Sequence, residues 1–220
     1  MLEIEMTNVK VKRKDVISDK EFEETVAKAD KLDKEYFRLR AKALLGLFAR
    51  TGKRRQEVAW LEPEDLAVKG DNLSVTFTVV KKRKKSVISK RREKQIPLSD
   101  SCAQYIMDYW NWMKKNHPKC KYLFPSIKSV FGIDLLFYKD RHLSGRHILR
   151  IVKELNPRLW CHLFRETVGA EVVREDQSLI GVFKVMMRLD LEKETTAWNY
   201  VRRFAVDVIE HEKKPRNAGA

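Results

Sequence analysis

The chain has 220 residues, of which 46 are Lys or Arg and 31 are Asp or Glu, so its formal net charge is +15. An apolar fraction of 43%, with five Trp, ten Phe and six Tyr, can build a core and excludes a wholly disordered chain. Eight Gly and six Pro exclude collagen-like and linker-like sequences. We therefore expect one folded domain, and the surplus positive charge favours a polyanionic partner, with nucleic acid ahead of an anionic membrane.

Helices are predicted in the first part of the chain. Residues 1–20 have a mixed pattern and are interpreted as an arm or a strand. Ser18 followed by Glu21 is typical of a capping box, so a helix is predicted to begin there. Residues 34–50 carry apolar side chains at helical spacing, and Gly52 is predicted to end the helix that they form.

The apolar pattern then changes from helical to strand-like. Residues 73–80 are rich in β-branched and aromatic side chains, and Gly70 with Asp71 is typical of a turn before a strand. Residues 92–98 are interpreted as the partner strand, which a long basic segment joins to the first. The sequence therefore predicts a small antiparallel hairpin within an otherwise helical chain.

Helices are predicted again over most of the remaining chain. Ser99 is expected to cap a helix that ends near Asn116, whereas residues 117–142 have no clear period. Four further helices are predicted over residues 144–154, 163–174, 178–188 and 195–210. This order of elements predicts a mainly helical α+β fold with a small antiparallel β-sheet.

The three cysteines, Cys102, Cys120 and Cys161, are widely spaced and odd in number. They are interpreted as reduced, mostly buried thiols of an intracellular protein, and their spacing predicts no metal site. No apolar run reaches the length of a signal peptide or a membrane span, so we expect no membrane association.

The positive charge is concentrated on one segment. Residues 81–94 hold nine basic residues and one acidic residue, which leaves a net charge of +8, just over half of the total. A solvated hairpin and a nuclear-import signal are alternative interpretations of such a run. We expect a contact with DNA phosphates, made by Lys81, Lys82, Arg83, Lys85, Lys90, Arg91 and Arg92.

Three short motifs outside this segment carry groups that suit phosphate chemistry. Arg54 and Glu57 are three residues apart, and a helical turn would place them on one face. His162 and Arg165 have the same spacing, which combines a proton donor with a planar guanidinium fork. Tyr200 lies on an amphipathic segment near the C-terminus. Each motif alone is more often structural, as a charged turn, a satisfied histidine or a core tyrosine.

Taken together and in this order, the motifs resemble the tyrosine recombinase (phage integrase) family. ARTGKRRQEVAWLEPEDL (49–66) is similar to the family's first box, in which TG-x-R-x-x-E precedes an apolar stretch and an acidic turn. KYLFPS (121–126) is similar to its aromatic-Phe-Pro segment, and HLFRETVGAEVV (162–173) to the second box, H-x-x-R. ETTAWNYV (194–201) resembles the final box, which ends in the nucleophilic tyrosine. The resemblance covers about residues 35–205.

The resemblance implies a role for each residue of the three motifs. Arg54 and Arg165 would be the two catalytic arginines, and His162 would be the histidine of the second box. Tyr200 would be the nucleophile, and it is the only tyrosine after Arg165. Glu57 would be the acidic residue that orients the others.

The family also has a catalytic lysine on the hairpin. Counting back from Pro97 and Leu98 through the second strand favours Lys84 for this role. The basic run offers other candidates, so three alternatives stay open, namely Lys82, Lys85 and Lys90.

One element departs from the family pattern. The family usually has Leu-Gly-His shortly before the tyrosine, with a histidine or tryptophan as a second donor. Residues 187–193 here are Met-Arg-Leu-Asp-Leu-Glu-Lys, which contain neither. Either Arg188 or Lys193 replaces the donor, Trp198 fills the space, or the role is empty.

The implied activity is that of a site-specific DNA recombinase, or integrase. Such an enzyme cuts and rejoins duplex DNA through a 3′-phosphotyrosyl intermediate, and the resemblance implies neither a metal nor a cofactor. The alternatives are a non-catalytic DNA-binding relative of the same fold and a type IB topoisomerase-like enzyme. The expected partner is duplex DNA, with a homotetramer on DNA, a monomer left open without it, and no membrane.

The domain organisation follows from the same resemblance. Residues 21–205 are expected to form the catalytic domain, and residues 1–20 an N-terminal arm or the remnant of a linker. Residues 206–220 are expected to be a tail that docks on a neighbouring protomer or packs on its own chain. A fragment of a longer recombinase and a naturally short member both fit, in the cytoplasm of a prokaryotic cell that hosts the enzyme or its virus or plasmid.

Overall fold

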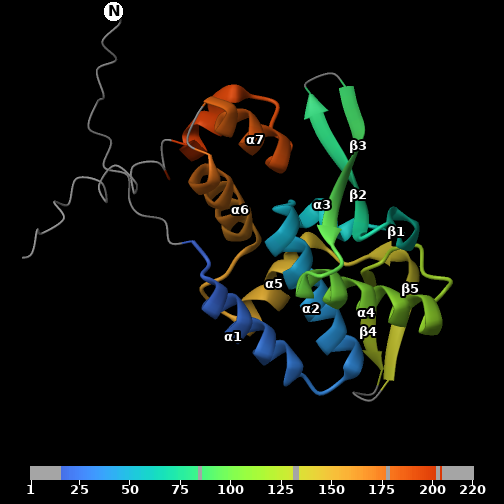
Figure 1. The fold of residues 1–220 in the computed structure, drawn as a ribbon. Helices are drawn as coiled ribbons and strands as arrows, with labels where there is room; N and C mark the ends of the chain where they lie inside the picture. Colours follow the sequence, from blue (N-terminus) through green and yellow to red (C-terminus); the bar gives the residue numbers. More distant parts are fainter. Residues whose placement is uncertain (1–15, 84–85, 131–133, 177–178, 202–203, 205–220) are drawn as a thin grey trace, which may run out of the picture.

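The computed structural model describes residues 16–83, 86–130, 134–176, 179–201 and 204 (Figure 1). Its helices are α1 (Asp19–Asp30), α2 (Glu35–Thr51), α3 (Arg55–Ala59), α4 (Ser101–Asn116), α5 (Gly145–Leu155), α6 (Cys161–Glu175) and α7 (Leu179–Leu189), with a 3-10 turn at Pro63–Asp65 and helical residues 194–201. The long hairpin β2–β3 and α7 lie at one end of the molecule, and the smaller hairpin β4–β5 lies toward the other (Figure 1). The predicted mainly helical α+β fold is confirmed.

Local sequence signals explain where several helices begin and end. The hydroxyl of Ser18 accepts a hydrogen bond from the backbone N–H of Glu21 at 3.2 Å, which is the predicted cap of α1. Gly52 ends α2 in the left-handed conformation with φ of 57°, where a side chain would be strained. The cap of α4 is Asp100 rather than the predicted Ser99, because its carboxylate is placed to accept from the N–H of Cys102 at 2.8 Å.

The main sheet is antiparallel, with strand order β1 (Leu66–Lys69), β2 (Asn72–Arg83) and β3 (Ser86–Pro97). Its register pairs Leu73 with Ile96 and Val79 with Lys90. The prediction of a long basic loop between the strands was wrong, because the pairing continues to Arg83 and Ser86. Val80, Val87 and Ile88 extend the β-branched pattern through the basic run, which explains the longer ribbon.

A second hairpin, β4 (Pro125–Val130) and β5 (Asp134–His142), was not predicted. Residues 117–142 were expected to be irregular because their apolar residues show no clear period. Leu135 and Phe137 nevertheless alternate with exposed positions and pack against the core, as a half-buried strand requires.

The hydrophobic core falls into two clusters. The larger one surrounds α2, where the ring of Phe48 is fully buried and its centroid lies 5.9 Å from that of Phe164 on α6. The smaller one joins α6, α7 and the helical residues 194–201, and it includes Val185, Leu189 and Tyr200. The helix predicted over 178–188 therefore packs against the described part of the helix predicted over 195–210, whose residues 202–203 and 205–210 lie outside the described residues. Among the described helices, none combines the length and apolarity needed to cross a bilayer.

We expect Phe48→Ala to lower the free energy of unfolding by about 3–5 kcal/mol, because it removes a fully buried ring and leaves a cavity between α2 and α6. Equilibrium unfolding in guanidinium chloride, followed by circular dichroism, measures this change. A loss below about 1 kcal/mol would contradict the packing of α2 on α6.

The cysteine thiols are buried and free, as predicted for reduced cysteines. Burial raises the pKa of Cys102 to about 12, despite the opposing charge of Arg50. Burial likewise raises the pKa of Cys161 to about 11. Because the thiolate is the reactive form, both groups should stay protonated and react slowly with Ellman's reagent at pH 8. Fast reaction of all three thiols in the folded protein, matching the rate in urea, would contradict this burial.

Candidate active site

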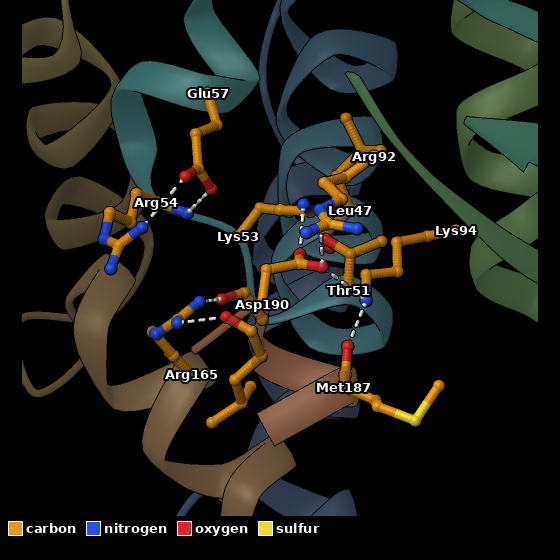
Figure 2. Close-up of polar contacts among 12 residues, drawn as sticks. Leu47, Thr51, Lys53, Arg54, Glu57, Arg92, Lys94, Arg165, Met187 and Asp190 are labelled. Carbon is orange, nitrogen blue, oxygen red and sulfur yellow. Dashed lines mark hydrogen bonds and ion pairs between the residues drawn. The ribbon is translucent and has the colours of Figure 1, made fainter. Parts of the chain in front are cut away.

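Arg54 lies in the turn between α2 and α3, where it is hydrogen-bonded to Glu57 on α3 (Figure 2). Arg54 is the residue that precedes α3, and its backbone N–H donates to Glu57 Oε2 at 2.9 Å. Its Nη1 donates to Glu57 Oε1 at 3.1 Å. The Glu57 side chain is 7% exposed, whereas that of Arg54 is 49% exposed. A buried carboxylate therefore orients a guanidinium group that remains accessible to a ligand.

Arg165 on α6 lies beside this turn and is buried, with 3% of its surface exposed. Its Nη1 donates to the carbonyl oxygen of Gly52 at 2.7 Å, and its Nη2 donates to the carbonyl oxygen of Leu189 (Figure 2). Burial lowers the pKa of Arg165, and the positive charge of Arg54 lowers it further. The two guanidinium groups are thus close enough to repel each other, as they would be around a shared anion.

Tyr200 lies next to Arg165. Its side chain is 8% exposed, and its ring packs so closely on Gly169 that a β-carbon added there would lie 2.6 Å from Tyr200 Cδ1. Gly169 is one helical turn after Arg165 on α6. An interaction with Tyr200 opposes the fall in the pKa of Arg165 that burial and Arg54 cause. The structure therefore brings the tyrosine hydroxyl to the second arginine within the same chain.

His162 lies at the start of α6 and is 60% exposed. Its Nε2 is 3.5 Å from Oε1 of Glu166, which is buried. Glu166 was not recognised from the sequence, because a glutamate within a helix usually faces solvent. The histidine thus lies on the same helix as Arg165, at the exposed edge of the cluster formed by Arg54, Arg165 and Tyr200.

The hairpin residues are described only in part. Lys84 and Lys85 lie outside the described residues, and so do the side chains of Lys81, Lys82 and Arg83. On β3, Arg91 Nη2 lies 2.5 Å from Asp65 Oδ1, so this arginine is bound to the acidic turn after α3. The described residues Lys90, Arg91 and Arg92 are exposed, and with α7 they line a cleft of about 510 Å³.

Three charged residues that the sequence did not single out meet beside this cleft (Figure 2). Lys53 is 1% exposed, and its Nζ lies 2.5 Å from Asp190 Oδ2. Lys94 Nζ lies 3.3 Å from Asp190 Oδ1 and donates to the carbonyl oxygen of Met187 at 2.8 Å. Burial lowers the pKa of Lys94, and the nearby Lys53 acts in the same direction, while Asp190 opposes both. The burial of Lys53 was not predicted from the sequence, because a lysine in a charged turn is usually solvated.

Asp190 lies in the segment that departs from the family pattern. Of the residues expected to compensate, Arg188 donates its Nη2 to the carbonyl oxygen of Arg50 at 2.9 Å. Trp198 donates its Nε1 to Glu194 Oε1 at 3.1 Å, within its own helical turn. Lys193 is exposed. The acidic side chain of Asp190 faces the cluster of cations.

This arrangement offers cationic donors and a hydroxyl group rather than a metal cage. Within the described ranges, no group of three His, Cys, Asp or Glu side chains is placed to hold a metal ion. Two guanidinium groups that face the same space can bind a tetrahedral anion, and the adjacent hydroxyl can act as a nucleophile.

The family model that matches this chain is that of the phage integrase family, over residues 15–204. The fold is similar to XerH site-specific recombinase bound to difH substrate in a pre-cleavage complex, with a TM-score of 0.60, 16% identity, and 93% of this chain and 54% of that chain covered. It is also similar to XerH in a post-cleavage complex with palindromic difH, with a TM-score of 0.64, 16% identity, and coverage of 92% and 54%.

A third similar structure is the Tn1549 transposon integrase in complex with transposon right-end DNA. Its TM-score is 0.55 at 12% identity, with 94% of this chain and 68% of that chain covered. The chain spans about half the length of the XerH chains, and at these identities the structures show a common fold. No curated protein matches the chain.

Proposed function

Because the chain belongs to the phage integrase family, we propose that it is a site-specific DNA recombinase that cuts and rejoins duplex DNA through a 3′-phosphotyrosyl intermediate. The observation that carries this proposal is the position of Tyr200 against Arg165, with Arg54 close to the same guanidinium group. Structures of similar fold were determined with DNA substrates, which supports duplex DNA as the partner.

In the proposed cleavage step, Tyr200 Oη attacks the phosphorus of a DNA phosphodiester. A bond forms between Oη and phosphorus, and the bond from phosphorus to the 5′ oxygen breaks. The phenol releases its proton to solvent on attack, and the departing 5′ oxygen takes up a proton from a general acid. A phenol is a weak nucleophile until it loses its proton, so the adjacent Arg165 cation favours attack by stabilising the phenolate.

The two arginines stabilise the transition state. Negative charge develops on the non-bridging oxygens, and Arg54 can present its planar fork to them. Both terminal nitrogens of Arg165 already donate to backbone carbonyl groups, so Arg165 contributes its positive charge and its remaining N–H groups. Glu57 keeps Arg54 in place through two hydrogen bonds. His162, on the rim of the cluster, is proposed as a further donor to the same oxygens.

The proton for the 5′ oxygen is proposed to come from a hairpin lysine. Lys84 is the sequence-based candidate for this general acid, with Lys82, Lys85 and Lys90 as alternatives. Rejoining reverses the steps when another 5′-hydroxyl attacks the phosphotyrosine. Because the covalent bond conserves the energy of the phosphodiester, the cycle that we propose uses neither a nucleotide cofactor nor a metal.

The basic hairpin provides the DNA contact in this proposal. Lys90 and Arg92 are exposed on β3 beside the cluster, where they can reach phosphates flanking the scissile bond. Residues 21–205 serve as the catalytic domain, and four copies assemble on paired DNA sites.

The test uses a library of nicked duplexes with randomised sequence around the nick. Cleavage near a nick releases a short strand and traps the covalent complex, so adducts that survive denaturant can be isolated and sequenced. We expect a covalent adduct enriched in one site sequence. Absence of adducts from the whole library, for protein that binds duplex DNA, would contradict the proposal.

A non-catalytic DNA-binding relative is the second candidate, favoured by Asp190 in the segment where the family usually has a histidine. It predicts salt-sensitive binding to duplex DNA without an adduct. A type IB topoisomerase-like enzyme would instead relax supercoiled plasmid without enrichment of a site. The sequenced adduct library separates all three activities.

A further inference from the structure

The carboxylate of Asp190 is the meeting point of three segments of the chain. It follows α7, and it pairs with Lys53 from the turn after α2 and with Lys94 from β3. Arg92 Nε, also on β3, is 4.0 Å from Asp190 Oδ1. Figure 2 shows these cations converging on the one carboxylate.

Lys53 and Lys94 need the negative charge of Asp190 because both ammonium groups are largely buried. The side chain of Lys53 is 1% exposed and that of Lys94 is 11% exposed. A buried ammonium group without a counter-charge is strongly unfavourable, so the removal of the carboxylate would drive both lysines to move or lose their protons.

The residues of this cluster are adjacent in the sequence to the residues that we propose for catalysis, or to their hydrogen-bond partners. Lys53 directly precedes Arg54, and Asp190 directly follows Leu189, whose carbonyl oxygen accepts from Arg165. The segment after Asp190 leads into the helical residues that carry Tyr200. A shift of the Lys53–Asp190 pair would therefore displace the arginines relative to the tyrosine.

We propose that Asp190 is a positioning residue, whose carboxylate acts through Lys53 and Lys94 to hold the turn of Arg54 and strand β3 against the segment that carries Tyr200. This inference rests on the proposed strand-cleavage function and deepens it. It assigns the acidic side chain a role in the part of the chain that lacks the usual histidine.

The backbone at Asp190 guides the choice of substitution. Its φ of 50° is in the left-handed region, which Asn tolerates as well as Asp does. Asp190→Asn therefore removes the charge and keeps the shape of the side chain and the backbone. Asp176→Asn is the matched control, because Asp176, at the end of α6, forms a separate ion pair with Lys184 on α7 at 2.7 Å.

The experiment measures the rate of adduct formation at saturating DNA, and separately the affinity for DNA, using the site recovered from the library. Asp190→Asn should cut at least about 10-fold more slowly, with an affinity within about 3-fold of the wild type, because positioning affects the chemical step. Lys53→Met should behave similarly. The double variant should be no slower than the slower single variant, because both disrupt one interaction.

A second readout follows Lys94 directly, by NMR of the lysine side chains as a function of pH. The charges that face Lys94 come from Asp190, Lys53, Arg92 and Arg188. Asp190 alone among these favours the charged amine, so Asp190→Asn should lower the pKa of Lys94 further, and Asp176→Asn should leave it unchanged.

The outcomes separate this inference from the function on which it rests. If the wild-type protein forms no adduct, the proposed function is wrong and the inference fails with it. If the wild type forms the adduct and Asp190→Asn cuts equally fast, only the role of Asp190 is wrong. If Asp190→Asn does not fold, the double variant with Lys53→Met removes the buried ammonium group together with its counter-charge, and wild-type cleavage by this variant would overturn the inference.

Discussion

Tyr200→Phe is expected to reduce covalent adduct formation by at least about 10³-fold, because it removes the oxygen that we propose as nucleophile. The ring remains, so packing on Gly169 is preserved. Only the hydroxyl group beside Arg165 is lost, so stability should change by no more than about 1 kcal/mol. The measurement is the yield of denaturant-resistant adduct with a nicked duplex, beside an unfolding curve.

Two controls make this result specific. Tyr105→Phe removes a hydroxyl group on α4, outside the cluster, and should cut at the wild-type rate. DNA affinity of Tyr200→Phe should also match the wild type, since the basic hairpin is unchanged. Adduct formation by Tyr200→Phe at the wild-type rate would mean that another residue is the nucleophile.

Arg54→Ala should separate catalysis from folding. We expect a loss of about 10²–10³-fold in the cleavage rate at saturating DNA, as for removal of one preorganised donor to a developing oxyanion. Stability should change by less than about 1 kcal/mol, because the Arg54 side chain is half exposed. The Glu57 carboxylate keeps the backbone N–H of residue 54 as its partner.

Arg165→Ala provides the contrast for this prediction. It should lose cleavage and also destabilise the protein by about 3 kcal/mol or more, since its buried guanidinium bonds two backbone carbonyl groups. Arg174→Ala, on the exposed face of the same helix, should change neither property. Guanidinium unfolding and adduct rates together decide the outcome, and equal loss of stability in Arg54→Ala and Arg165→Ala would contradict the account.

Local sequence signals were sufficient for much of the fold. Ser18 and Gly52 marked the ends of helices correctly, because capping and left-handed turns depend on a few neighbouring residues. The β4–β5 hairpin was missed, because the exposed position between Leu135 and Phe137 is also apolar, Leu136, so the alternation in burial does not appear in the sequence.

The candidate site was predictable only where its residues form recognisable motifs. Arg54 and Arg165 match the family boxes, Tyr200 is the only tyrosine after Arg165, and the structure places the three near one another. The pairing of Lys53 with Asp190 joins residues far apart in the chain, and no local pattern reports that a lysine is buried. The choice of Lys84 remains a prediction, since that residue lies outside the described part of the chain.

The most direct test of the account is to locate the covalent bond. The adduct formed with a nicked duplex is digested with protease and nuclease, and mass spectrometry identifies the peptide that retains a nucleotide. The account predicts a 3′-linked nucleotide on Tyr200 and a free 5′-hydroxyl on the released strand. A nucleotide on any other residue, or linkage through the 5′ phosphate, would contradict it.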